Sequence, residues 1–282
     1  MVPHREQPAA TGRGGFGAVA TLTVVVAARD EEAMLPGCLR RLEFADEVIV
    51  AVDDRTVDGS AAVASAAGAT VLRQHFTDFA QFKNAAIERA TSDWVFVVDA
   101  DERVSRALAA EIAIQLDGPA DGMRVQMHNY FHGQLMRWGG WQERPLRLWR
   151  VGMATYRGEL HERPVFDDPG PRIAELAAPL VHLSHRSVPD NLAKSMRYVE
   201  VDSRARLRRG DPPVTARSML WRVVREVGFR LVLRQGWRDG PAGVYEALYW
   251  PLSHLSADMR LWELQQTPSI EERYEMLEDG TW

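Results

Sequence analysis

Apolar and polar residues alternate in blocks along the first hundred positions, in a pattern typical of strands buried between helices. Three blocks are almost wholly apolar and rich in β-branched residues: Thr21–Ala28, Glu47–Val52 and Trp94–Val98. Such unbroken apolar runs are typical of parallel strands with both faces covered. Apolar residues at helical spacing over 31–42, 58–67 and 79–90 predict covering helices, and Thr70–Leu72 predicts a short further strand. This alternation predicts βαβ crossovers and a doubly wound α/β sheet.

The pattern changes after Arg103. Short strand-like runs follow at 123–127, 146–149 and 180–183, with tryptophans and glycines between them. From Asn191 onward the spacing of apolar residues is mostly helical. We therefore expect an α/β domain over residues 18–190 and a helical region over residues 191–282. Residues 1–17, rich in glycine, proline and charge, are expected to form a disordered leader.

Composition narrows the classes of function. The chain has 282 residues, of which 46% are hydrophobic and 26% charged, as in an ordinary folded protein. A formal net charge of −5 argues against a globally basic protein that binds nucleic acid. The single cysteine, Cys38, cannot form an internal disulfide, which suits a reducing compartment. Of the 34 basic residues only Lys83 and Lys194 are lysines, a bias that we attribute first to genome composition.

The sequence does not predict a membrane-spanning segment. The longest uncharged stretch, residues 14–28, is shorter than the roughly 18–20 residues that a spanning helix needs. It runs into charged residues without the small-residue cleavage site of a signal peptide. We therefore expect a cytoplasmic protein, and attachment to the inner face of the plasma membrane stays open.

Acidic residues follow each of the three long predicted strands. They are Asp30, Glu31 and Glu32 after the first, Asp53, Asp54 and Asp58 after the second, and Asp99, Asp101 and Glu102 after the third. Ligands of open α/β sheets bind outside the carboxyl ends of the strands, so these carboxylates are expected to gather at one edge. Negative charges crowded together repel one another unless a cation neutralises them. The carboxylate oxygens of an Asp-x-Asp tripeptide suit Mg²⁺ or Mn²⁺ as ligands. Turn formation and helix capping are the alternative roles of these aspartates.

The position of the Asp-x-Asp tripeptide matters more than its presence. A chain with this many aspartates contains about one such tripeptide by chance. Here it comes directly after the apolar run WVFVV, at the end of a predicted strand. Neither GxGxxG nor GxxxxGK[ST] follows any predicted strand, which argues against dinucleotide-binding and P-loop folds.

Three motifs together resemble a family 2 glycosyltransferase. They are VVVAARDEE (24–32), EVIVAVDDRTVDGS (47–60) and FTDFAQFKNAAIERATSDWVFVVDADERV (76–104). The resemblance is closest to the branch that includes the lipopolysaccharide-core glucosyltransferases, and it continues more weakly through 147–162, 180–185 and 192–198. The sequence departs from the family in two places. Asp30 stands where the family usually has Asn, and residues 53–56 stand where this branch often has Asp-Ser-Gly-Ser. Both departures affect the expected contacts to the donor base.

The resemblance implies a fold and a donor site. The fold is GT-A, the Rossmann-like fold of nucleotide-diphospho-sugar transferases, with a mixed sheet flanked by helices and here a helical C-terminal extension. The donor is a nucleotide-diphosphate sugar, with uridine as the default base, and the sugar is transferred with inversion. The residues implied to lie near the nucleotide are Ala28, Asp30, Glu32, Asp53, Asp54, Lys83, Asn84 and Asp99.

The resemblance also implies a divalent metal, Mn²⁺ or Mg²⁺, that bridges the two phosphates. Asp101 is the implied metal ligand, Asp99 contacts the ribose or a metal-bound water, and His182 completes the metal shell. A buried structural role is the alternative for His182. A metal stabilises the leaving diphosphate as a Lewis acid, so that the reaction needs only one general base for the acceptor hydroxyl.

Glu162 is the candidate general base, in the motif Gly158-Glu159-Leu160-His161-Glu162. Glu159 and His161 are rivals, and the alternative is a hairpin edge with solvated charge. Trp138 and Trp141 resemble an acceptor-side loop in which aromatic faces stack on sugar, and core packing is the alternative for both.

The segment 217–234 predicts a basic helix with bulky apolar residues, a type that can lie on an anionic membrane. Packing of this helix on the α/β domain, with arginines paired to acids, is the alternative.

The acceptor is a glycan, a lipid-linked molecule or a small molecule, and we expect no nucleic-acid partner. Two rival functions are a nucleotidyltransferase, which would need a glycine-rich phosphate loop after the first strand, and a non-catalytic module that binds nucleotide sugars.

Overall fold

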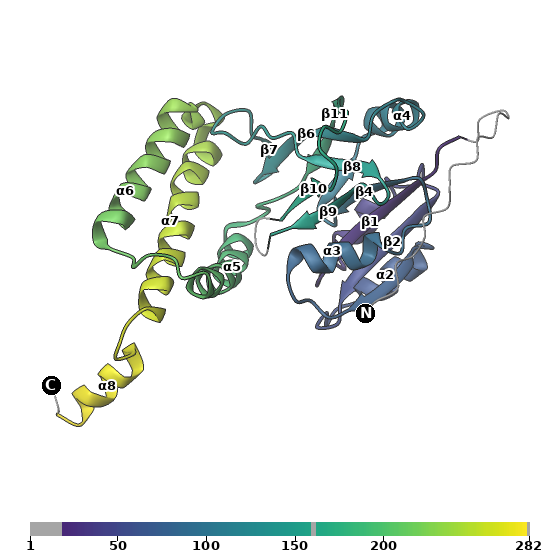
Figure 1. Cartoon of the computed structure of the whole chain (residues 1–282). Coiled ribbons are helices and arrows are strands. Elements are labelled where there is room, and N and C mark those ends of the chain that lie inside the picture. Colours follow the sequence, from purple (N-terminus) through teal and green to yellow (C-terminus); the bar gives the residue numbers. More distant parts are fainter. Residues whose placement is uncertain (1–18, 159–161, 281–282) are drawn as a thin grey trace.

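The computed structural model describes residues 19–158 and 162–280 (Figure 1). Its centre is a sheet in the order β3-β2-β1-β4-β8-β6-β11-β5, with β7 beside β6. The four strands at one end are parallel. They are β1 (Leu22–Ala28), β2 (Glu47–Asp53), β3 (Thr70–Gln74) and β4 (Trp94–Asp99). The predicted doubly wound part of the fold is therefore confirmed.

The other strands make the sheet mixed. They are β5 (Glu102–Val104), β6 (Gly122–Phe131), β7 (Gln134–Leu135), β8 (Leu146–Arg150) and β11 (Ile173–His182). Strand β8 is antiparallel to β4 and to β6, whereas β11 runs parallel to β6. A separate hairpin pairs β9 (Ala154–Arg157) with β10 (Arg163–Phe166). A mixed sheet flanked by helices was the fold class expected, and the structure confirms it.

Helices cover both faces of the sheet, which explains why its strands are apolar throughout. The helices are α1 (Leu35–Leu39), α2 (Ser60–Ala66), α3 (Phe79–Ile87) and α4 (Arg106–Gln115). Along β1, Val24 and Val26 pack in one core with α1, α2 and α4, whereas Val25 packs in a second core with α3. The helix expected over 31–42 is shorter than predicted. It begins at Leu35 with Pro36 in its first turn, where a missing N–H costs nothing.

The helical region forms an arm at one side of the sheet (Figure 1). It consists of α5 (Val188–Arg208), α6 (Ala216–Val227), the π-helix η1 (Gly228–Leu233), the 3₁₀ helix η2 (Gly236–Asp239), α7 (Gly240–Leu264) and α8 (Ile270–Glu278). Buried Glu246 of α7 fixes the arm to the sheet, because its two oxygens lie 3.1 Å from His132 Nε2 and 2.8 Å from His185 Nδ1. Among the described residues no helix combines the length and apolarity needed to cross a bilayer. The expected leader lies outside the described residues.

Candidate functional site

The carboxyl ends of β1, β2 and β4 lie side by side, as the sequence predicted. Ala28 is in register with Val52, and Ala27 is in register with Asp99. The chain goes from β1 to β2 on one side and later returns to place β4 on the other side of β1. Such a reversal of strand order opens a crevice at the strand ends, which is where ligands of α/β sheets bind. The acidic residues after the three strands therefore lie along one edge of the sheet, at the position expected for this crevice.

Several of these acids hold the loops around the crevice. Asp30 Oδ1 accepts a 2.9 Å hydrogen bond from the Val57 N–H, and Glu32 Oε2 accepts one of 2.9 Å from the Gly59 N–H. Asp58 accepts hydrogen bonds from the backbone N–H groups of Glu32 and Ser60, the turn-forming role given as its alternative. These carboxylates position the rim of the crevice through backbone hydrogen bonds.

The carboxylates after β2 have basic partners. Buried Asp53 accepts hydrogen bonds from the Arg55 guanidinium, and Arg29 lies 3.6 Å away. Burial acts to raise the pKa of Asp53, but the hydrogen bonds from Arg55 outweigh it and hold the pKa below its usual value. Asp54 is more exposed, and its Oδ2 lies 3.0 Å from His75 Nδ1.

Lys83 joins α3 to two carboxylates of the crevice. Its side chain is 7% exposed, and Nζ lies 2.9 Å from Glu162 Oε1 and 3.4 Å from Asp99 Oδ1. Arg147 of β8 contacts Asp99 from the other side at 3.4 Å. Burial acts to raise the pKa of Asp99, but the charges of Lys83 and Arg147 outweigh it and hold the pKa well below its usual range. Asp99 is thereby kept as a carboxylate at the end of β4.

Asp101 and His182 form a second pair at the same edge. His182 Nε2 lies 3.4 Å from Asp101 Oδ2, and Lys194 Nζ lies 3.9 Å from the same oxygen. Asn129 orients the imidazole, because its Nδ2 donates to the Trp141 carbonyl and its Oδ1 must therefore accept from His182 Nδ1–H, at 2.7 Å. His182 consequently presents Nε2 towards Asp101.

The donor chemistry of this pair fits a divalent metal. Metal-binding histidines commonly donate their other ring N–H to an oxygen acceptor, as His182 does to Asn129. Mg²⁺ usually takes one or two protein ligands and completes its shell with phosphate oxygens and water. The described part of the chain contains no group of three or more His, Cys, Asp or Glu side chains arranged to hold a metal by themselves. Asp101 and His182 are the two side chains at this edge whose donor atoms suit such an ion.

Two further glutamates show how acidic the crevice is. Burial, together with the charge of Asp101, raises the pKa of Glu31 to about 7. Burial and the charge of Asp99 raise the pKa of Glu102 to about 7, although Arg147 acts in the opposite direction. An ionised carboxylate is therefore disfavoured at either position, and an added cation would relieve this cost.

The remaining sequence-predicted residues differ in their surroundings. Asn84 uses both amide atoms on the Tyr156 backbone, with Nδ2 donating to the carbonyl and Oδ1 accepting from the N–H. Trp141 is buried against Phe131, and the Arg230 guanidinium covers it at 4.3 Å, which is the packing role given as its alternative. Trp138 is partly exposed under Arg238. The rivals of Glu162 as base, Glu159 and His161, lie outside the described residues.

Arg147 and Lys194 also belong to the site, although no sequence motif marked them. Arg147 contacts both Asp99 and Glu102, and Lys194 contacts Asp101. A signal for Lys194 was present in the composition. The chain has only two lysines among its 34 basic residues, and both lie beside carboxylates of this crevice. The position of both lysines beside these carboxylates is the signal that composition offered.

Comparison with known proteins gives a consistent result. Residues 23–165, just over half of the chain, match the family described as Glycosyl transferase family 2. The chain is 28% identical over 240 residues to the lipopolysaccharide core biosynthesis glycosyltransferase LpsC of Rhizobium meliloti, covering 80% of this chain and 86% of that protein. It is 35% identical over 103 residues to a TPR repeat-containing protein of Synechococcus elongatus, of which it spans only 26%.

Among solved structures, the chain is similar to S. aureus TarS 1–349 with 12% identity and a TM-score of 0.43, covering 93% of this chain and 92% of that one.

Proposed function

Because the chain belongs to glycosyl transferase family 2, we propose that it transfers a sugar from a nucleotide-diphosphate donor, by default a UDP-sugar, to an acceptor hydroxyl with inversion at the anomeric carbon. One observation carries the proposal. The crevice at the carboxyl end of β4 brings Asp99 and Asp101 together with the only two lysines of the chain, Lys83 and Lys194. The carboxylates can border a nucleoside or hold a metal, and the ammonium groups beside them can face phosphate oxygens. This combination suits a nucleoside diphosphate.

A divalent metal, Mn²⁺ or Mg²⁺, would be held by Asp101 and His182. When bound it would neutralise charge on the departing diphosphate. Lys194, 3.9 Å from Asp101, would place a further positive charge beside the same phosphates. Asp99, fixed between Lys83 and Arg147, would accept from the ribose or from a metal-bound water.

Glu162 would act as the general base. Its Oε1 contacts Lys83 Nζ at 2.9 Å, and Oε2 has no hydrogen bond with any residue in the described ranges. In the proposed step the acceptor oxygen forms a bond to the anomeric carbon while the bond from that carbon to the diphosphate oxygen breaks. The acceptor proton passes to Glu162, and the electron pair of the broken bond leaves with the diphosphate. The contact with Lys83 fixes the carboxylate of Glu162 relative to Asp99.

A donor screen with product analysis tests this proposal. UDP-glucose, UDP-galactose and UDP-GlcNAc are incubated with the protein and Mn²⁺, and UDP release is measured. We expect release with at least one donor, a loss of at least 100-fold in Asp101→Asn, and no change in Asp167→Asn, an exposed control.

Release of pyrophosphate from UTP and a sugar phosphate would favour a nucleotidyltransferase instead. Binding of UDP-sugars without any release of UDP would favour a non-catalytic binding module.

The exposed face of α6 supports peripheral contact with a membrane, which we propose for segment 217–234. Leu220, Trp221 and Val224 are each at least 60% exposed and follow helical spacing. Pairing of arginines to acids, the alternative role, accounts for Arg222 and Arg225. Leu220 and Val224 stay exposed, and the Arg225 guanidinium lies 4.8 Å from the centre of the Trp221 ring, which is itself 60% exposed. Amphipathic helices of this kind bind the interface of anionic bilayers.

Co-sedimentation with vesicles tests the membrane contact. We expect binding to vesicles with anionic lipid and a loss of at least 10-fold in Trp221→Glu. The control is Ile114→Glu, which alters an equally exposed apolar residue on α4. Equal binding by the two variants would contradict the proposal.

A further inference from the structure

Helices α5 and α7 line most of an open pocket of about 280 Å³ next to the crevice. Two of its lining residues connect it to the candidate site. Lys194 lies 3.9 Å from Asp101, and the ring of Tyr198 stacks on Phe79 of α3 with centroids 6.0 Å apart. Burial raises the pKa of the Tyr198 hydroxyl, although the neighbouring charge of Lys194 acts in the opposite direction.

The lining of the pocket combines aromatic faces with polar groups. Tyr198 and Trp250 contribute the rings, and Asn191, Ser253 and His254 contribute polar atoms. We propose that this pocket binds the terminal sugar ring of a glycoside acceptor, an inference that rests on the transferase function proposed above. A pyranose has an apolar C–H face and a rim of hydroxyls, which match these two kinds of surface. The volume lies near the lower end of the roughly 300–1,000 Å³ typical of small-molecule sites, which suits one ring.

An unpaired buried amide supports a ligand in this pocket. Asn191 is 4% exposed, and its side-chain Nδ2 has no hydrogen-bond partner among the described residues. A buried donor without a partner is costly, and a sugar hydroxyl oxygen would satisfy it. His254 Nδ1–H donates to the Trp250 carbonyl at 3.0 Å, so Nε2 is available to accept from a hydroxyl. The pocket thus offers both a donor and an acceptor.

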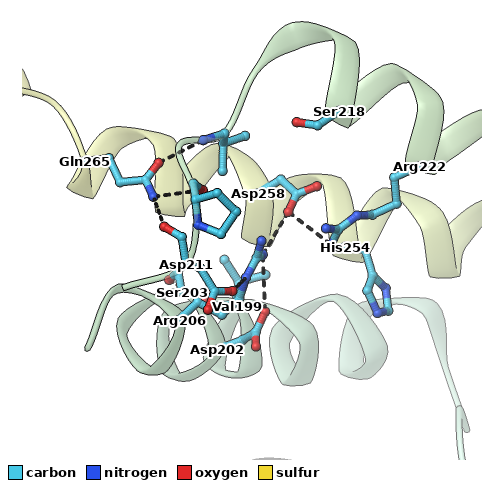
Figure 2. A network of polar contacts seen from close by, with 12 residues as sticks. Val199, Asp202, Ser203, Arg206, Asp211, Ser218, Arg222, His254, Asp258 and Gln265 are labelled. Carbon is cyan, nitrogen blue, oxygen red and sulfur yellow. Dashed lines mark hydrogen bonds and ion pairs between the residues drawn. The ribbon is translucent and has the colours of Figure 1, made fainter. Parts of the chain in front are cut away.

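A network of ion pairs fixes the walls of the pocket (Figure 2). Arg206 of α5 and Arg222 of α6 converge on Asp258 of α7, at 2.8 Å and 3.1 Å. Asp258 is 3% exposed and lies one helical turn beyond His254. Because this carboxylate joins all three helices, the separation of α5 and α7 is set before a ligand arrives. Preformed pockets of this kind are typical of small-molecule sites.

A second hollow, of about 370 Å³, borders the same two α7 side chains as the first. It shares Trp250 and His254 with the pocket and extends between α6 and α7, where Trp221 and Arg222 line it. This hollow gives room to the aglycone or to the next unit of the acceptor. The acceptor class is therefore a substituted glycoside rather than a free sugar.

The test uses octyl glycosides as probes, namely octyl β-glucoside, β-galactoside and α-mannoside below their micelle concentrations. UDP release from UDP-sugars is measured with and without each probe, and UDP affinity is measured separately by calorimetry. Ser253→Trp fills the pocket, whereas its neighbour Leu252→Trp places the same ring on the exposed side of α7. We expect a probe to stimulate UDP release by the wild type and by Leu252→Trp, and the stimulation to fall at least 10-fold in Ser253→Trp, with unchanged affinity for UDP.

A second variant keeps the pocket testable if Ser253→Trp does not fold. Asn191→Leu removes the unpaired donor and keeps the number of side-chain heavy atoms, and we expect the probe KM to rise about 5- to 10-fold at unchanged kcat. Equal stimulation in both tryptophan variants and an unchanged KM in Asn191→Leu would overturn the pocket assignment. UDP binding without stimulation of the wild type by any glycoside would overturn the acceptor class alone. If the wild type neither binds UDP nor releases it, the transferase function fails and the pocket assignment with it.

Discussion

Replacement of Glu31 by glutamine should stabilise the metal-free protein in a pH-dependent manner. The pKa of Glu31 is raised from 4.5 to about 7 by burial and by the charge of Asp101. The carboxylate form therefore destabilises the folded state, by about 3 kcal/mol if the whole shift is counted. Glu31 keeps partial contact with solvent, so screening reduces the expected effect to about 1–2 kcal/mol.

The sign of the effect follows from the direction of the shift. A raised carboxyl pKa does not change the free energy of unfolding while the folded and unfolded states both hold the proton. The loss of stability grows as pH rises from about 4.5 through about 7. Glutamine mimics the protonated side chain, so its benefit should be full at pH 8 and about a quarter as large at pH 5. For a chain of this size, we expect the melting temperature to rise by about 2–6 °C at pH 8.

Thermal unfolding in chelator at pH 5 and pH 8 measures this effect. The matched control is Glu43→Gln, at an exposed loop position, which should change the melting temperature little at either pH. Addition of Mn²⁺ should shrink the gain of Glu31→Gln, because the cation relieves the same repulsion. An equal gain at both pH values, or a loss at pH 8, would show that the carboxylate of Glu31 does not destabilise the fold.

Three further variants test the contacts around the site and the arm. Lys83→Gln leaves Asp99 and Glu162 without their shared ammonium, and urea unfolding should show a loss of about 3 kcal/mol that Lys83→Arg partly restores; an unchanged midpoint would contradict this. Arg206→Met deprives buried Asp258 of its 2.8 Å partner, and we expect a loss of about 2–3 kcal/mol in the same assay. Its double variant with Asp258→Leu should regain most of that loss. Asn129→Leu removes the acceptor that orients His182, so Mn²⁺ affinity in the presence of UDP should fall about 10- to 100-fold by calorimetry, whereas unchanged affinity would separate His182 from the metal.

Much of the fold could be predicted because the signals are local. The unbroken apolar runs at β1, β2 and β4 reveal strands with both faces covered, and the acids after them mark the carboxyl edge of the sheet. Pro36 explains the main error in the predicted helices, because it confines α1 to the residues after the first acidic loop. The onset of the helical arm was predicted within a few residues, since α5 begins at Val188.

The pairing of side chains within the site was harder to predict from sequence. Arg147 lies on β8, and no local pattern indicates that β8 pairs with β4 and brings this arginine to Asp99. The pocket of α5 and α7 depends on helix packing across more than fifty residues of sequence, as in the contact of Asn191 with Tyr249. Trp141 illustrates the same limit, because its motif fits either sugar stacking or packing and only the tertiary contacts distinguish them.

Donor binding and turnover can be separated at Glu162, the proposed general base. UDP affinity and the rate of acceptor-stimulated UDP release are measured for the wild type and for Glu162→Gln, which preserves the shape of the side chain beside Lys83. We expect a UDP affinity within about twofold of the wild type and a turnover lower by at least about 100-fold, as for loss of a general base. A variant that turns over at the wild-type rate would show that Glu162 is not the base.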